Sequence, residues 1–158
     1  MKRHIPATAA LLAPLSAIAA PGVANAAPPE AASGTVQQTS FVVTGTRTAD
    51  GVTFFTFDET DSLSGAFAGT STLSGECIQR ATGPILCKAQ ETFTGTVLGR
   101  SGTVDLLDLI SIDPTTGAVQ GSFVSVGGTG ELSGLHTHVT FEAQGASGTY
   151  SGTAVFTP

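Results

Sequence analysis

The sequence predicts an all-β protein that forms a single eight-stranded antiparallel up-and-down β-barrel, with no substantial helix after its N-terminal segment. Apolar and polar side chains alternate with a period of two, and no window shows the spacing of an amphipathic helix. Thr and Ser are abundant, and turn signals divide the chain into short runs. Short connections make neighbouring strands antiparallel, and closing the sheet removes its exposed edges. A sandwich of the same strands is the alternative fold.

The first 26 residues have the three-part pattern of a secretory signal peptide. Lys2 and Arg3 provide a positive start, an Ala/Leu-rich run follows, and the small residues Ala24 and Ala26 precede a cleavage position. The apolar run is short and broken by prolines, whereas a membrane anchor needs about 20 apolar residues. We therefore expect a secreted, extracellular protein with no membrane contact once the signal peptide is removed.

The exported chain divides into a leader and one domain. Residues 27–38 are rich in Pro, Ala, Ser and Gly and are typical of a flexible leader, so the barrel domain is expected to span 39–158. Turn-forming residues, among them Asp61-Ser62 and the segment 127–130, separate the runs of the domain. The expected strands are residues 39–47, 52–60, 64–77, 86–98, 102–111, 118–126, 136–143 and 148–156.

Alternation gives several of these strands one apolar face. The residues that share a face are Leu63, Phe67 and Leu73 around the third strand, Ala89, Glu91, Phe93 and Val97 in the fourth, Val139, Phe141 and Ala143 in the seventh, and Tyr150, Ala154 and Phe156 in the eighth. Glycines inside the strands permit the tight coiling of a small barrel. The aromatic residues expected to line its interior and contact an apolar ligand are Phe41, Phe67, Phe93, Phe123, Phe141 and Tyr150.

The charge balance excludes one large class of partner. The chain has six Lys and Arg and twelve Asp and Glu, so the net charge is −6, and it becomes −8 once Lys2 and Arg3 are removed. A nucleic-acid binder needs a cationic face to replace phosphate counterions, so no nucleic-acid partner is expected. No Gly-rich loop precedes a helix and no nucleophile elbow is present, so we expect no nucleotide site and no cofactor.

The two cysteines predict one structural disulfide. Cys77 and Cys87 are the only cysteines, and a Gly83-Pro84 turn signal lies between them. Both can face each other across a hairpin, and export makes oxidation the default. The spacing differs from that of a redox or metal pair, and no further ligand lies nearby.

Two segments resemble a known group of barrels. The first is Glu91-Thr92-Phe93-Thr94-Gly95 followed by Gly99-Arg100-Ser101-Gly102-Thr103, and the second is Gly128-Thr129-Gly130-Glu131-Leu132-Ser133-Gly134-Leu135. Together with the glycine placement over roughly 35–156, they resemble the allene oxide cyclase-like superfamily, which includes dirigent proteins, and within it a bacterial family of unknown function. The resemblance implies an eight-stranded antiparallel barrel, in some members with a central hydrophobic cavity. It implies no particular activity.

Glu91 is the candidate catalytic residue. It lies on the apolar face of its strand, between Ala89 and Phe93, where burial would raise its pKa and suit it to acid–base chemistry. Pairing with Arg47, a hydrogen bond from Tyr150 or the backbone, or a bulge that turns it outward would make it structural instead. Asp105 and Asp108 fall on opposite faces of another strand, and the sequence leaves open which of them points inward.

A histidine pair forms the alternative metal site. His136, His138 and Glu142 share one face of a strand and, with Gly130, resemble the first cupin motif, Gly-x5-His-x-His-x3-Glu. The chain has no later histidine for a second motif, and Glu142 lies about 13 Å along the strand from His138. We therefore expect a solvated polar face here and no metal.

Three functions remain open. The first is a secreted barrel that binds a small apolar ligand without catalysis. The second is a cyclase- or dirigent-type protein that guides a reactive substrate, with Glu91 as its polar group. The third is a structural or surface-interaction barrel whose interior is filled by side chains. Whether the protein is an enzyme, and in which oligomeric state it exists, stay open at this stage.

Overall fold

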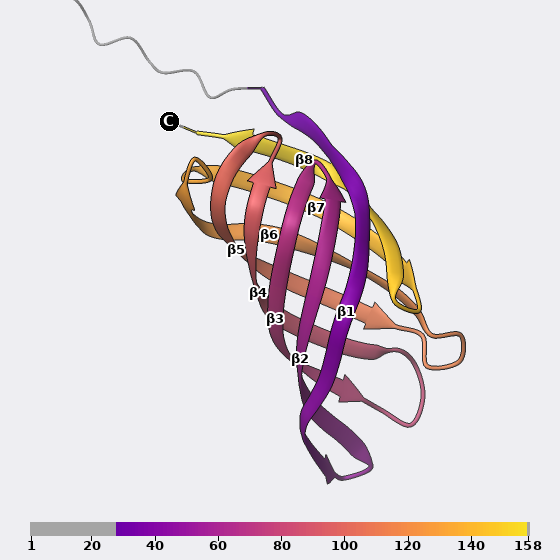
Figure 1. Ribbon diagram of the computed structural model, residues 1–158. Helices are drawn as coiled ribbons and strands as arrows, with labels where there is room; N and C mark the ends of the chain where they lie inside the picture. Colours follow the sequence, from indigo (N-terminus) through magenta and orange to yellow (C-terminus); the bar gives the residue numbers. More distant parts are fainter. Residues whose placement is uncertain (1–27, 158) are drawn as a thin grey trace, which may run out of the picture.

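The computed structural model describes residues 28–157, which form eight antiparallel strands and no helix (Figure 1). The expected signal peptide lies outside the described residues. No helix able to cross a membrane occurs in the described part. The strands are β1 (Glu30–Ala49), β2 (Val52–Gly65), β3 (Phe67–Gln79), β4 (Ile85–Val97), β5 (Arg100–Ile112), β6 (Ala118–Gly130), β7 (Leu135–Gln144) and β8 (Ser147–Phe156).

The strands pair in sequence order, and β1 also pairs with β8, so that the sheet closes into a barrel. The all-β, eight-stranded, antiparallel prediction is confirmed. β1 closes the ring because it is long: Gly34 pairs with Gly65 of β2 on one side and with Tyr150 of β8 on the other. Beyond Gln37, β1 leaves β8 and continues with β2 as a hairpin that projects from the ring (Figure 1).

The expected leader is wrong from Glu30 onward. Residues 30–37 are the part of β1 that pairs with β8, so the domain begins with them and not at residue 39. Local composition misleads here because Ala, Ser and Gly have low strand propensity and follow Pro28-Pro29. Hydrogen-bonding partners on both sides hold this segment extended, and no local pattern reports them.

Two expected breaks lie inside strands. Asp61 and Ser62 belong to β2, and each of them pairs with both β1 and β3. The segment 127–130 is the end of β6, and the connection that follows it is the turn 131–134. Turn-type residues are tolerated at these positions because the neighbouring strands supply the backbone partners. Between the expected strands 39–47 and 52–60 the chain does turn, at Asp50-Gly51, with both residues at positive φ.

The barrel interior has two ends with different contents. At the packed end, where the β2–β3, β4–β5 and β6–β7 turns lie, Phe67 is fully buried and its ring meets the rings of Phe93, Phe123 and Tyr150 at centroid distances of 5.4, 5.5 and 5.8 Å. Leu132, from the 131–134 turn, closes this end and is fully buried. At the hollow end, where the other four hairpin connections lie, a smaller group of buried residues surrounds an empty space: Phe57, Leu73, Cys77, Cys87 and Ala89.

A disulfide joins Cys77 and Cys87 at the hollow end, as the sequence predicts. The two cysteines are directly paired across β3 and β4, and both side chains point into the barrel. The disulfide therefore ties these strands together beside the cavity. On the outer face at the neighbouring pair, Lys88 Nζ lies 3.0 Å from Glu76 Oε1 in an exposed ion pair.

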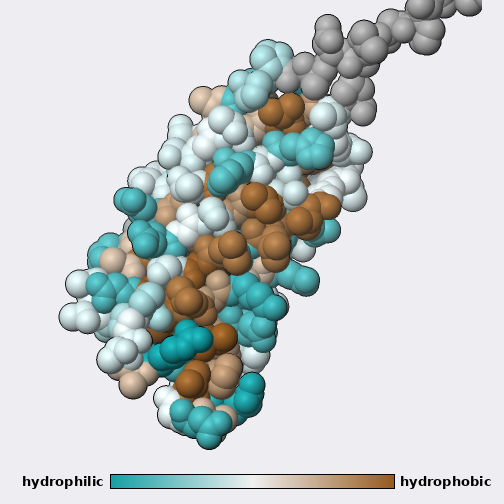
Figure 2. Space-filling view, turned by 180° about the vertical axis from the view of Figure 1, so that it is seen from behind, coloured by the Kyte–Doolittle hydropathy of each residue, from teal (hydrophilic) through white to brown (hydrophobic). Residues whose placement is uncertain are grey.

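The outer surface is mostly Thr, Ser and charged residues, with some apolar exceptions. Figure 2 shows apolar surface running in a band along one face of the molecule. Exposed apolar side chains occur on the outward positions of three consecutive strands, at Leu86 of β4, Leu107 and Leu109 of β5, and Val124 and Val126 of β6.

Candidate functional site

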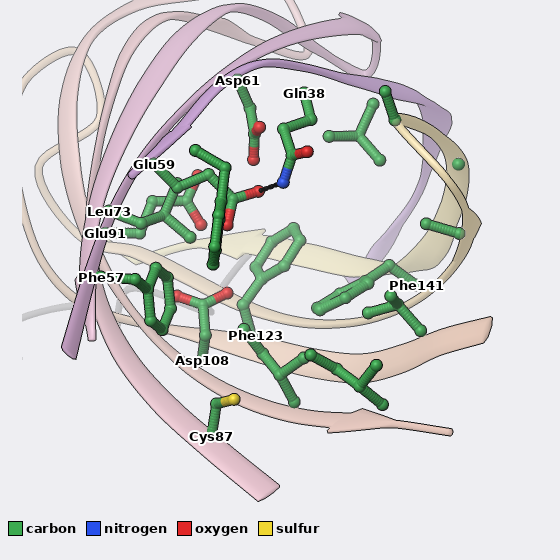
Figure 3. A pocket seen from close by; sticks show the side chains of 18 of the residues that line it. Gln38, Phe57, Glu59, Asp61, Leu73, Cys87, Glu91, Asp108, Phe123 and Phe141 are labelled. Atoms are coloured by element: carbon green, nitrogen blue, oxygen red, sulfur yellow. Dashed lines mark hydrogen bonds between the residues drawn. The ribbon is translucent and has the colours of Figure 1, made fainter. Parts of the chain in front are cut away.

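The hollow end of the barrel contains a cavity of about 140 Å³. Its walls are largely apolar and come from all strands of the ring, and it reaches the surface at the β7–β8 turn, where exposed Gly145 and Ala146 line it. Figure 3 shows the side chains that point into it. The apolar lining residues include Val36, Phe41, Phe57, Leu63, Leu73, Ile110, Ile112, Val119, Phe123, Phe141 and Ala143.

Four carboxyl groups line one side of this apolar space. Glu59 and Asp61 come from β2, Glu91 from β4 and Asp108 from β5, and we call these four residues the carboxyl cluster. Strand alternation places them: Phe57, Glu59, Asp61 and Leu63 are consecutive inward positions of β2. Figure 3 shows the carboxyl groups of the cluster on the side of the cavity away from Phe141.

The cluster is buried and incompletely hydrogen-bonded. Asp61, Glu91 and Asp108 are only 8%, 5% and 2% exposed. Gln38 Nε2 donates to Glu59 Oε1 at 2.8 Å, as the dashed line in Figure 3 shows. In contrast, Asp61 Oδ1, Asp108 Oδ2 and the hydroxyl of neighbouring Ser71 are buried without any hydrogen-bond partner among the described residues. Unpartnered buried polar atoms destabilise a fold by about 1–3 kcal/mol each, so their retention favours a functional role.

Burial governs the protonation of the cluster. Desolvation, reinforced by the nearby carboxyl groups of Glu59 and Glu91, raises the pKa of Asp61 to about 8. Desolvation and the charge of Glu91 raise the pKa of Asp108 to about 9. Asp61 and Asp108 are therefore mainly protonated at neutral pH when the cavity is empty. Each is able to act as a donor in that form and as an acceptor once it ionises.

Glu91 is placed as the sequence predicts, inside the barrel between Ala89 and Phe93. Burial raises its pKa to about 7, although the nearby polar side chains of Ser71 and Asp108 lower it in part without forming a well-aligned hydrogen bond. Arg47 does not pair with it but lies over the Phe54 ring, 4.0 Å from the centroid.

None of the cationic side chains among residues 28–157 lines the cavity. Lys88 is engaged with Glu76 on the outer face, and Arg100 lies over the Phe156 ring at the packed end, 3.9 Å from its centroid. Arg80 is exposed in the β3–β4 loop. The cavity therefore holds only acidic and neutral groups.

The six predicted aromatic residues divide between the two ends. Phe41, Phe123, Phe141 and Tyr150 line the cavity, and the rings of Phe41 and Phe57 stack at 5.3 Å. Phe67 and Phe93 do not line it: they are fully buried and fill the packed end. The sequence predicts that all of these rings point inward, but it does not predict the position of each ring along the barrel axis.

The Tyr150 hydroxyl has a structural role at the β2–β3 turn. It accepts a hydrogen bond from the Phe67 N–H at 2.8 Å and donates to the Ser64 carbonyl at 3.0 Å. Burial raises the pKa of this hydroxyl. The ring passes over Gly34, where a Cβ atom would collide with it, so Gly34 is required for this close approach. Only the ring of Tyr150 is available to a ligand.

The other predicted polar residues lie outside the cavity. Asp105 points outward and accepts a hydrogen bond from Thr92 Oγ1 at 2.9 Å, so Asp108 is the inward aspartate of β5. His136, His138 and Glu142 are exposed on the outer face of β7. Within residues 28–157, no three His, Cys, Asp or Glu side chains lie close enough together to hold a metal ion.

Sequence reasoning missed most of the carboxyl cluster. The sequence analysis assigns Asp61 to a turn and Gln38 to the leader, and it does not single out Glu59, which lies inside the expected strand 52–60. A signal was nevertheless present. Extending the alternation of β2 past residue 60 puts Glu59 and Asp61 on the same face as Phe57 and Leu63.

Comparison with known proteins agrees with this architecture. A family model described as a protein of unknown function, DUF3224, matches residues 32–152. A solved structure of a DUF3224 protein with unknown function from Shewanella oneidensis MR-1 is similar in fold, with a TM-score of 0.66 and 19% sequence identity over 83% of this chain and 99% of that chain. No curated protein matches. The expectation of a family of unknown function is confirmed.

Proposed function

The chain belongs to the DUF3224 family, and from the site described above we propose that it binds a small, largely apolar molecule in the hollow end of its barrel. The observation that carries the proposal is the cavity itself: aromatic and aliphatic walls enclose it, and a few polar groups converge on one side. This combination is typical of small-molecule sites. A barrel with a purely structural role would have no need of a void or of unpartnered buried oxygens.

The size of the cavity limits the ligand. An engineered apolar cavity of about 150 Å³ in another protein binds benzene. A volume of about 140 Å³ therefore suits one aromatic ring or a similar aliphatic body with a short substituent. Larger molecules would have to extend past Phe41, which is 44% exposed, into the solvent beyond the mouth.

We also propose that the protein acts outside the cell. The sequence pattern of residues 1–26 favours export, and the disulfide between Cys77 and Cys87 is stable in an oxidising compartment. N-terminal sequencing of the protein from its own host tests this proposal. We expect mature protein in the medium that begins at Ala27, and an intracellular chain that begins at residue 1 or 2 would refute it.

Ligand entry is tested by filling the cavity. Toluene and ethylbenzene should raise the melting temperature of the wild-type protein, because they bind the folded state. Ala143→Leu, which adds volume at the cavity wall, should abolish the shift, whereas Ala118→Leu on the exposed start of β6 should preserve it. Absence of binding by every apolar probe would favour the structural barrel instead.

Catalysis is a second candidate function because of Glu91. A buried carboxyl with a pKa of about 7, exposed to an apolar cavity, suits general acid–base chemistry of the kind a cyclase- or dirigent-type protein needs. Turnover of a reactive substrate that is lost in Glu91→Gln, with binding retained, would establish it. Equal turnover by wild type and Glu91→Gln would rule it out.

A further inference from the structure

We propose that the ligand of the hollow end carries a positively charged organic amine group, which the carboxyl cluster binds while the aromatic wall holds its apolar body. This inference rests on the proposed ligand-binding function and specifies its chemical class. The placement of the four carboxyl groups, the oxygens among them without described partners, and the absence of a counter-ion on the described cavity walls support it.

The placement of the cluster favours a ligand that donates hydrogen bonds. Carboxyl groups from three strands line one cavity, and Asp61 Oδ1 and Asp108 Oδ2 have no hydrogen-bond partner among the described residues. Asp61 and Asp108 are 92% and 98% buried, so bulk water does not readily hydrogen-bond to their side-chain oxygens. A ligand with several N–H donors would supply the kind of partner that these atoms lack. The hydroxyl of Ser71, also unpartnered and 1% exposed, lies beside them.

The charge of the cavity favours a cation. Full ionisation of the cluster would place up to four negative charges in the cavity, and no Lys, Arg or His of the described chain lines it to balance them. An ammonium group supplies both the missing positive charge and up to three donors. An anionic ligand would add to the repulsion among the carboxyl groups. A neutral ligand would supply no positive charge, so it would leave the carboxyl groups to stay protonated.

The opposite wall of the cavity favours an apolar body beside the cationic group. Phe123 and Phe141 lie 6.4 Å apart, centroid to centroid, with nearly parallel rings, and both face the cavity. Such rings provide apolar contact for a ligand body and favourable electrostatics for a nearby cation. The polar wall and the aromatic wall together match a molecule with a cationic head and a hydrocarbon body.

A bare metal ion fits this site less well than an organic cation does. The described residues contain no group of three ligand side chains with metal-binding geometry. A metal would also leave the apolar walls formed by residues such as Ile110 and Phe141 without contact.

A matched set of probes tests the charge preference. Benzylammonium, ethylbenzene and benzoate have similar size and differ in charge, and their dissociation constants are to be measured by NMR titration of the full secreted chain at pH 8. We expect benzylammonium to bind at least tenfold more tightly than ethylbenzene, because charge-assisted hydrogen bonds are stronger than apolar contact alone. Benzoate should not bind measurably.

Two variants test whether the carboxyl cluster is responsible for the preference for a cation. Asp108→Asn removes a carboxyl group that is able to ionise beside a bound cation in the cavity, and Asp105→Asn removes a carboxyl group on the outer face of the same strand. We expect the first to weaken benzylammonium binding about tenfold and to leave ethylbenzene binding within twofold, and the second to change neither. If Asp108→Asn does not fold, Glu59→Gln, which keeps an acceptor for Gln38, replaces it.

The possible outcomes separate this inference from the function on which it rests. Binding of no probe would refute the proposed function. Binding of ethylbenzene as tightly as benzylammonium, or equal weakening by the Asp105→Asn control, would overturn the cation inference and leave apolar ligand binding intact. Tighter binding of benzylammonium that depends on Asp108 supports both.

Discussion

The two ends of the barrel are built from the same eight strands and differ in what their inward positions carry. At the packed end, inward residues such as Phe67, Phe93 and Leu106 are at most 1% exposed, and none of these three lines the cavity. At the hollow end, inward Glu59 and Asp108 surround a void of about 140 Å³. The packed end follows the ordinary rule that interiors are apolar and dense, and the hollow end departs from it.

This difference teaches which end stabilises the fold and which end serves a ligand. A sequence selected only for stability would place apolar residues at Asp61 and Asp108, because unpartnered buried carboxyl groups are unfavourable. Natural proteins break such rules mainly at functional sites. The packed end and the disulfide offset the cost at the hollow end. Substitutions at the packed end should therefore mainly lower the free energy of unfolding, whereas substitutions at the hollow end should mainly change its dependence on pH.

The largest expected effect is a loss of stability with rising pH, and it originates at the hollow end. Folded pKa values of about 8 for Asp61, 7 for Glu91 and 9 for Asp108 exceed the ordinary values near 4, so the folded state retains protons that the unfolded state has released. Stability should be highest below about pH 4 and fall as pH rises to 9, on the order of 1 kcal/mol per pH unit for each retained proton.

Guanidinium unfolding followed by circular dichroism at pH 5, 7 and 8.5 measures this slope. Asp108→Asn should flatten it, whereas Asp105→Asn on the outer face should preserve it. A free energy of unfolding that increases from pH 5 to 8.5 would show that the cluster is ionised and compensated in the folded state.

The next largest effect is expected at the packed end. Phe67→Ala removes a fully buried ring that contacts three others, and we expect a destabilisation of about 3–5 kcal/mol. Phe141→Ala removes a half-buried ring at the edge of an existing cavity, and we expect roughly half that value. Equal losses in the same unfolding assay would mean that the hollow end is packed as tightly as the other.

The sequence predicts the packed end much better than the hollow end. Alternation places Phe67, Phe93 and Val97 inward because apolar residues on one face leave a clear period-two signal. Strand number and order are also predictable, since the Gly and Pro turn signals lie close to most true turns. The Cys77–Cys87 pairing follows because only two cysteines exist.

The hollow end is harder to predict because its polar residues have the local composition that is typical of loops. Asp61-Ser62 resembles a turn, yet both residues are held in the middle of a sheet by partners on each side. Residues 30–37 resemble a linker, yet they close the ring against β8. Both errors have one cause. Pairing with distant strands overrides local propensity, and the sequence of a segment does not identify the strands with which it pairs. The cavity itself depends on side-chain volumes around the whole ring.

Removing the disulfide should have an intermediate effect at the hollow end. Cys77→Ala combined with Cys87→Ala should destabilise the protein by roughly 2–3 kcal/mol, the value expected for a short closed loop. Lys88→Ala breaks the exposed ion pair on the outer face of the same two strands and should lose at most about 1 kcal/mol. Similar losses from the two changes would indicate that β3 and β4 are held by their backbone pairing alone.

The smallest expected effect is the difference in stability between two Ala→Val substitutions, one at each end of the barrel. Ala154→Val at the packed end forces extra volume into a site that is 1% exposed, so we expect a loss of about 1–3 kcal/mol. Ala143→Val at the cavity wall adds volume where space exists and favours the strand, so its stability should change by no more than about 0.5 kcal/mol. Thermal unfolding of both variants measures the contrast. A loss at Ala143 as large as that at Ala154 would show that the cavity closes in solution when no ligand is bound.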